Sequence, residues 1–222
     1  MKNPFPNGED TRELLPGVSC HMMVKNPPID RLAALVVYLA PYVNEFVIID
    51  TGSTAVDIAK MKNWNYEAFP PVHVFSETFE DFSTTRNKGL LRHKYDWTIA
   101  FDPDELPSMQ MMHHIAVATS EAGKAKAPSV IGWQYWTMNW WDGKLGKPMD
   151  YHWHIRAWKT KGSFLYRPVH ELVAVQGHPE TITRATSWCP RAPVEAYLIH
   201  SKSAEELEEA DALYEKMGDV SR

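Results

Sequence analysis

The sequence predicts an α/β fold in three layers, built around a mostly parallel central sheet. Short apolar runs typical of buried strands alternate four times with segments whose apolar residues have helical spacing, as expected when helices join parallel strands. Acidic residues directly follow two of these strands, and a chain of 222 residues suits one large domain. We therefore expect helices on both faces of one sheet and ligands beyond the carboxyl ends of its strands.

The first predicted strand is the apolar run VSCHMMV at residues 18–24, which is short and partly β-branched. Pro27 and Pro28 then favour the start of a helix, and residues 28–43 have apolar positions at helical spacing. The second strand, residues 46–49, ends at Asp50 and a Gly-Ser-Thr turn. This unit therefore delivers a carboxylate to one edge of the predicted sheet.

The same alternation continues along the next fifty residues. Apolar runs of strand length are separated by segments that lack a strand pattern and contain helix formers. The predicted helices are residues 54–62 and 81–93, and the predicted strands are residues 72–76 and 97–101.

The second half of the chain changes to alternating polar and apolar residues, which are typical of short strands. A helix is predicted from Ser203, which forms a capping box with Glu206. The predicted strands lie within residues 129–144, 151–158 and 162–175. We expect an extended lead-in at 1–17, one domain at 18–200 with halves at 18–105 and 106–200, and a C-terminal helix at 201–222.

Composition and charge argue against several classes of protein. The net charge of −5 provides no basic signature for nucleic acid. No stretch approaches the ~18 apolar residues of a transmembrane helix, and the polar N-terminus lacks the apolar region of a signal peptide. The two cysteines, Cys20 and Cys189, form neither a disulfide framework nor a metal cluster. A cytoplasmic protein is expected.

The tip of the strand at residues 97–101 is the strongest candidate for a site. It leads directly into Asp102, Pro103, Asp104 and Glu105, and three carboxylates crowded together repel one another. Either water or a cation must therefore lie opposite them. Asp102 and Asp104, at i and i+2 on an extended backbone, point to one side and suit Mg²⁺ or Mn²⁺.

Five segments carry a resemblance to a known family. They are HMMVKNPPIDRL, VNEFVIIDTGST, FSTTRNKGL, WTIAFDPDEL and VHELV, and together they cover roughly residues 18–175. In this order they resemble the motifs of the family 2 glycosyltransferases of the GT-A fold, in the soluble bacterial and phage branch. The resemblance implies a metal-dependent transferase that moves a sugar from a nucleotide-diphosphate donor, most often a UDP-sugar, to an acceptor hydroxyl with inversion.

The same resemblance assigns expected roles to individual residues. The diphosphate would be held by a divalent cation, Mn²⁺ or Mg²⁺, which neutralises the charge that develops on the leaving group. Asp102 would contact ribose or metal. The nucleotide would be bound by Val24, Lys25, Asn26, Asp50, Arg86, Asn87 and Asp102, and the metal by Asp104, with Asp102 and His200 as further candidates. For His200, which ends an apolar run, a purely structural role is the alternative.

Two positions depart from the family pattern. The glutamate expected after Lys25-Asn26 is Pro27, and the aspartate that closes the G-S-T-D motif is Ala55. Asp57 lies two residues beyond Ala55 and is a possible substitute. These departures concern donor affinity and nucleotide choice, and they leave the D-x-D pair unchanged.

The acceptor side is expected at His170 and Glu171. HELVA resembles the start of a zinc-protease motif, but the second histidine is replaced by Ala174. In the glycosyltransferase interpretation Glu171 is the candidate general base for the acceptor hydroxyl. The alternative is a structural ion pair between Glu171 and Arg167 or Arg156.

Other functions and partners stay open at this point. A non-catalytic module that binds nucleotide-sugar or glycan is one alternative, supported by Pro27 and Ala55. A sugar nucleotidyltransferase is another, but the loop VKNPPIDRL lacks the glycines that cradle a triphosphate. The tryptophan-rich stretch 133–141 is either core or an aromatic platform for a sugar. The acceptor is a glycan, a protein, a lipid or a modified nucleobase.

Overall fold

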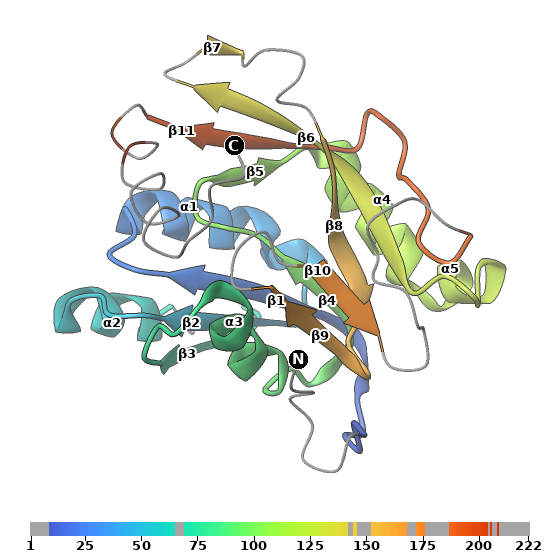
Figure 1. The fold of residues 1–222 in the computed structure, drawn as a ribbon, viewed down its shortest axis with the longest axis horizontal. Helices are drawn as coiled ribbons and strands as arrows, with labels where there is room; N and C mark the ends of the chain where they lie inside the picture. The colour runs from blue at the N-terminus through green and yellow to red at the C-terminus, as the bar shows by residue number, and fades with distance from the viewer. Residues whose placement is uncertain are drawn as a thin grey trace.

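The structure of the chain is a computed structural model that describes residues 9–64, 69–141, 144–145, 152–167, 172–175 and 187–203, together with residues 205 and 208. It confirms the predicted α/β fold (Figure 1). A nine-stranded sheet forms the centre, and a separate hairpin packs against one face.

The strands of the main sheet are not in chain order, because helical crossovers join the parallel ones. A short strand, β7 (Lys144–Leu145), extends the end of β6 outside the main row. The row is β3 (Val72–Ser76), β2 (Glu45–Asp50), β1 (Leu15–Val24), β4 (Tyr95–Ala100), β8 (His152–Lys159), β6 (Gly132–Trp141), β11 (Tyr197–Lys202) and β5 (Glu105–Pro107).

The first four strands are parallel, as the alternation of strands and helices predicts. Val24 at the end of β1 lies beside Asp50 at the end of β2, so both strands end at one edge. Beyond β4 the sheet is mixed: β8 is antiparallel to β4 and β6, whereas β11 is parallel to β6. The antiparallel strand β5 pairs with β11 and was not predicted, because three residues carry no period.

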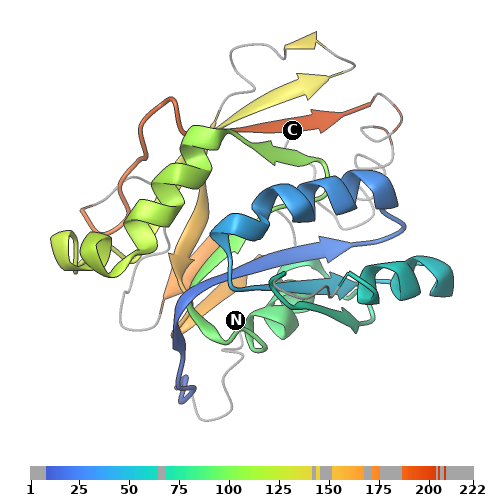
Figure 2. The same cartoon turned by 180° about the vertical axis from the view of Figure 1, so that it is seen from behind.

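Helices cover both faces of the sheet (Figures 1 and 2). One face packs against α1, α2 and α4 in the main core, where Leu32, Met61 and Ile115 are fully buried. The other face packs against α3 and the hairpin of β9 (Ser163–Tyr166) and β10 (Leu172–Val175). The helices are α1 (Ile29–Leu39), α2 (Ala55–Lys62), α3 (Phe82–Leu90), α4 (Met109–Thr119) and α5 (Glu121–Lys126), with a 3₁₀ turn, η1 (Ala40–Tyr42), after α1.

The side chains of β1 alternate between the two faces of the sheet, so this strand packs against the layers on both sides. Cys20 and Met22 belong to the core beneath α1, whereas Met23 belongs to the cluster on the opposite face. Neighbouring side chains of a strand point to opposite faces, so a continuous apolar run is required wherever both faces are covered. VSCHMMV is such a run.

The ends of the predicted domain differ from the sequence expectation in detail. β1 begins at Leu15, three residues before the predicted start. Before it, Arg12 donates to the carbonyl oxygen of Leu90 at 2.5 Å, and Asp10 accepts from the backbone of Gly162 at 2.9 Å. The lead-in therefore packs on the domain. At the other end β11 extends to Lys202, and the helix predicted from Ser203 lies largely outside the described residues.

Two imidazoles are buried between β1, β4 and α3. His21 Nδ1 lies 3.3 Å from His93 Nε2, and His93 Nδ1 lies 2.8 Å from the hydroxyl of Thr98. A Cβ at Gly89 would lie 2.4 Å from His21, so only glycine fits this turn of α3. Burial lowers the pKa of His21 to about 3, assisted by the nearby charge of Arg86, and burial also lowers the pKa of His93.

Acid is expected to destabilise the fold through this pair. The unfolded chain protonates histidine below pH ~6.5, whereas the folded chain keeps His21 neutral until about pH 3. Stability therefore falls as the pH drops from ~6.5 toward 3, by about 1.4 kcal/mol per pH unit for each buried histidine. Denaturant unfolding of wild type and His21→Asn between pH 7 and pH 5 measures this slope. An identical slope in the variant would contradict the assignment.

Candidate functional site

Three carboxylates follow β4, and each has a cation of its own. Asp102, Asp104 and Glu105 lie at the edge where β1, β2 and β4 end. Their partners are Arg86 from α3, Arg156 from β8, and His200 with Lys202 from β11. The sequence left open whether water or a cation lies opposite these acids. In the structure, cationic groups from three separate elements do.

Asp102 pairs with Arg86. The guanidinium donates to Asp102 Oδ1 at 2.6 Å, and Arg86 is buried at the site-facing side of α3. Loss of water around Asp102 opposes its ionisation. The charges of Arg86 and Arg156 and the hydrogen bond from Arg86 outweigh this effect and lower the pKa of Asp102 to about 2. Asp102 is therefore ionised at neutral pH, as a ligand for a cation or a sugar hydroxyl requires.

Glu105 lies behind the turn and supports it. It is 3% exposed, accepts the backbone N–H of Asp102 at 2.9 Å, and forms an ion pair with Arg156. Burial is the largest influence and raises the pKa of Glu105 to about 7, although Arg156 opposes the shift. Sequence reasoning missed this pair. Its signal was the third acid of the cluster, which needs a counter-charge if it is buried.

Asp104 faces β11. Its Oδ2 lies 3.0 Å from His200 Nε2 and 3.6 Å from the ammonium of Lys202. Its carbonyl oxygen accepts the backbone N–H of Ser201 at 2.9 Å, which ties the turn to the strand. The predicted candidates Asp104 and His200 are thus brought together, while Lys202 was not singled out from the sequence.

The side chains around Asp104 suit a divalent cation only if a substrate supplies further ligands. Among the residues that the structure describes, no group of three or more His, Cys, Asp or Glu side chains is arranged to hold a metal. Asp104 and His200 provide one carboxylate and one imidazole. Mg²⁺ and similar ions often bind through one or two protein ligands and complete their shell with substrate phosphates and water. The donor set fits that mode.

The residues predicted to hold the nucleoside gather at the ends of β1 and β2. Asp50 is 1% exposed and accepts the backbone N–H of Ser53 at 3.1 Å. Asn26 has a positive φ of 44°, and its N–H donates to the hydroxyl of Ser53 at 2.8 Å. Val24 is buried beside Asp50, whereas Lys25 is exposed. The two loops are thus joined, and their contact with a nucleotide stays a prediction.

Arg86 and Asn87 hold two different parts of the molecule. Asn87 donates to the carbonyl oxygen of Leu165 at 2.7 Å and accepts its N–H at 2.8 Å. This double hydrogen bond fixes β9 to α3, while the preceding Arg86 holds Asp102. The predicted nucleotide contact of Asn87 is untested, and much of its amide is committed to β9.

Asp57, the possible substitute for the aspartate that is missing at Ala55, contacts the start of α2. The backbone N–H of Asp57 donates to the hydroxyl of Thr54, and that hydroxyl donates to the Asp57 carboxylate at 2.7 Å. This reciprocal arrangement caps the start of α2. Asp57 therefore contributes to the helix start, and its contact with a nucleotide stays a prediction. Pro27, the other departure, is buried beneath its loop.

The acceptor-side candidates His170 and Glu171 lie outside the described residues, between β9 and β10. A structural ion pair of Glu171 with Arg167 or Arg156 stays an alternative. Arg156, proposed as a structural partner of Glu171, forms its ion pair with Glu105. Arg156 lies where the pairing of β8 with β6 shifts register, between Trp133 and Gln134.

Part of the tryptophan-rich stretch is core. Tyr135 is fully buried, and its hydroxyl lies 2.9 Å from His114 Nδ1 on α4. Trp133 packs edge-on against the same imidazole at 4.6 Å. Trp136 and Trp153 meet edge to face on the opposite side of the sheet, with ring centroids 5.3 Å apart. A sugar platform there stays a prediction.

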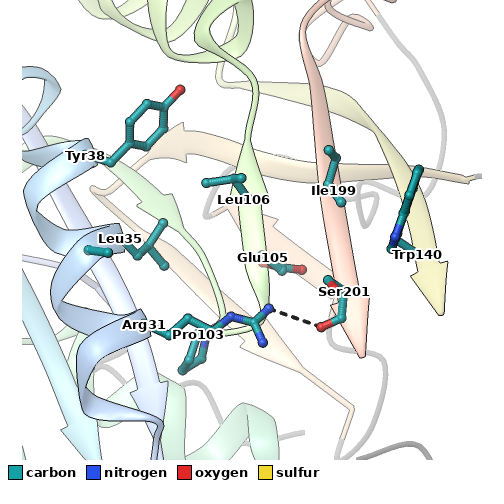
Figure 3. Close-up of a pocket in the computed structure, with 10 residues that line it drawn as sticks. Arg31, Leu35, Tyr38, Pro103, Glu105, Leu106, Trp140, Ile199 and Ser201 are labelled. Carbon is teal, nitrogen blue, oxygen red and sulfur yellow. Dashed lines mark hydrogen bonds between the residues drawn. The ribbon is translucent and has the colours of Figure 1, made fainter. Parts of the chain in front are cut away.

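A cavity of about 530 Å³ lies beside the turn, on the side of α1 (Figure 3). Its walls are α1, β5 and β11, and Leu106 and Ile199 make it largely apolar. Arg31 crosses it and donates to the carbonyl oxygen of Ser201 at 3.2 Å. Ser201 and Ile199 thus face this cavity, on the opposite face of β11 from His200.

Comparisons with known proteins agree with this architecture. No protein-family model matches the sequence, and no curated protein is significantly similar to it. The structure is similar to the crystal structure of S. aureus TarS, a glycosyltransferase, with a TM-score of 0.51 and 10% identity. The match covers 88% of this chain and 38% of that one. The chain thus shares the fold of that structure over most of its length. Among the described residues, no helix is long and apolar enough to cross a membrane.

Proposed function

We propose that the protein is a metal-dependent glycosyltransferase that moves a sugar from a nucleotide-diphosphate donor, a UDP-sugar, to an acceptor hydroxyl with inversion. One observation carries the proposal. In a glycosyltransferase-like fold, Asp102 and Asp104 follow a central strand at the edge of the sheet, and Asp104 lies 3.0 Å from His200. Ligands of such open sheets bind beyond the carboxyl ends of the strands.

In this proposal Asp104 and His200 hold a Mn²⁺ or Mg²⁺ ion, with Asp102 nearby. When bound, the ion neutralises charge on the diphosphate leaving group. Arg86 keeps Asp102 ionised and fixes its direction, and Glu105 with Arg156 supports the turn from behind. Asp50 and the loop from Val24 to Asn26 receive the nucleoside, and Glu171 accepts the proton of the acceptor hydroxyl. The acceptor stays a glycan, protein, lipid or modified nucleobase.

A donor screen tests the function directly. Purified protein is heated with Mn²⁺ and each of a panel of nucleotide sugars, and a true donor raises the melting temperature by mass action, stabilising by about 2.7 kcal/mol at a hundredfold excess over Kd. Glycosyltransferases commonly also hydrolyse their donor slowly without acceptor. We expect stabilisation and slow Mn²⁺-dependent release of UDP. Binding without any release, even with acceptors, would favour the non-catalytic module.

A further inference from the structure

Lys202 approaches the same carboxylate oxygen as His200. The two residues alternate along β11, so their side chains share one face, and both lie near Asp104 Oδ2, at 3.0 Å for His200 and 3.6 Å for Lys202. The intervening Ser201 faces the cavity on the other side (Figure 3). β11 is an interior strand between β6 and β5, so its direction is fixed by two neighbours.

The position of Lys202 is unusual for a lysine. Only 15% of its side chain is exposed, although lysines rarely lose this much water without a dedicated partner. Its nearest acid is shared with an imidazole and, in the proposed function, with a divalent cation. A lysine beside a divalent cation is repelled by it. When the cation is bound, the positive charges of the cation and Lys202 exceed the negative charge of Asp104, and a further anion is needed to neutralise them.

We propose that Lys202 binds the diphosphate of the donor and stabilises it as the leaving group. This inference rests on the proposed function. An ammonium donates charge-assisted hydrogen bonds to phosphate oxygens, and Lys202 is aimed at the place where the D-x-D turn would receive them. Donor binding then transfers the ammonium from Asp104 to the diphosphate, and Asp104 becomes free for the cation.

The group transfer balances with Lys202 in this role. The bond from the anomeric carbon to the diphosphate oxygen breaks, and its electron pair stays on that oxygen. The acceptor oxygen bonds to the anomeric carbon, and the acceptor proton passes to the carboxylate expected at Glu171. Lys202 keeps its charge throughout and lowers the energy of the negative diphosphate.

Substitution of Lys202 should have opposite effects on two ligands. Lys202→Met removes a hydrogen-bond donor to phosphate, so UDP affinity should fall by about 10- to 100-fold. The same change removes a positive charge beside Asp104, so Mn²⁺ should bind severalfold more tightly in the absence of nucleotide. Affinity for uridine, which lacks phosphate, should not change. A merely structural lysine would not give two effects of opposite sign.

The experiment measures UDP and uridine binding by calorimetry and Mn²⁺ binding by electron paramagnetic resonance. Lys126→Met, at the exposed end of α5, is the matched control for net charge. Lys202→Arg keeps the charge and should restore most of the UDP affinity. Should Lys202→Met fail to fold in a melting assay, Lys202→Gln replaces it.

The outcomes separate this inference from the function on which it rests. Weaker UDP binding with tighter Mn²⁺ binding supports it. Wild-type UDP affinity in Lys202→Met overturns the inference alone, and so does a parallel loss of uridine and UDP affinity. If wild type binds neither UDP nor any other nucleoside diphosphate, the proposed function fails, and the inference fails with it.

Discussion

Glu171→Gln is expected to slow sugar transfer by about 10²- to 10⁴-fold, the usual contribution of general base catalysis. An acceptor hydroxyl is a poor nucleophile at neutral pH, so an inverting transferase needs a positioned base opposite the leaving diphosphate. The described acids after β4 do not meet this need, because each already forms an ion pair with an arginine or a lysine. The base must come from elsewhere in the chain, and the VHE motif provides Glu171.

The described parts of the chain support a fixed position for the strand that leads to this residue. Asn87 binds both the N–H and the carbonyl oxygen of Leu165 in β9, and its neighbour Arg86 binds Asp102. Two adjacent residues of α3 therefore connect the turn that contains Asp102 with β9, which precedes the motif in the chain.

Measurement of donor binding distinguishes a general base at Glu171 from a structural or donor-binding residue. Steady-state transfer and UDP binding are measured for Glu171→Gln and for the control Glu121→Gln, an exposed position on α5. The control should match wild type in both. If Glu171→Gln transfers normally, or if it loses UDP affinity in parallel with rate, Glu171 is structural or lies on the donor side.

The second large effect is expected for Asp104→Asn, which should lose about 10²-fold or more in turnover. Removal of one electrostatic partner of a transition state typically has this magnitude. Asparagine keeps the shape of the side chain and the backbone bond from Ser201 to residue 104, so the turn should stay on β11. The melting temperature should accordingly stay near that of wild type.

Metal titration identifies the cause of this loss. Asp104→Asn should bind Mn²⁺ far more weakly than wild type, whereas Asp57→Asn, which affects contacts of Asp57 with Thr54 and Lys60 in the first turn of α2, should bind it normally. Wild-type turnover of Asp104→Asn in Mn²⁺ would refute the metal assignment.

The parallel half of the fold was accessible from the sequence because its signals are local. Each strand is a short apolar run, and each crossover begins at a recognisable position such as Thr54 or Asp81, whose side chains cap α2 and α3. The position of Asp50 and Asp102 at one edge then follows from parallel topology alone. The short strand β5 and the mixed order beyond β4 have no comparable local signal.

The partners of the acids were harder to predict because they depend on register between distant strands. Arg156 meets Glu105 across 51 positions through an irregular pairing of β8, which no sequence period encodes. Lys202 reaches Asp104 only because β11 pairs with β5 so that His200 lies opposite Glu105. His200 was predicted from the family resemblance, and the structure places it at Asp104.

The pairing of Asp104 with β11 has a consequence for the order in which the protein is made. Asp104 and His200 are separated by 96 positions in the chain. After the ribosome has synthesised the turn that contains Asp104, it must therefore translate most of the remaining chain before β11 is made. At ~5–20 residues per second, this leaves several seconds during which Asp104 has neither the imidazole nor the ammonium beside it. The parallel half can collapse during synthesis, but the site is assembled last, when β11 enters the gap between β6 and β5.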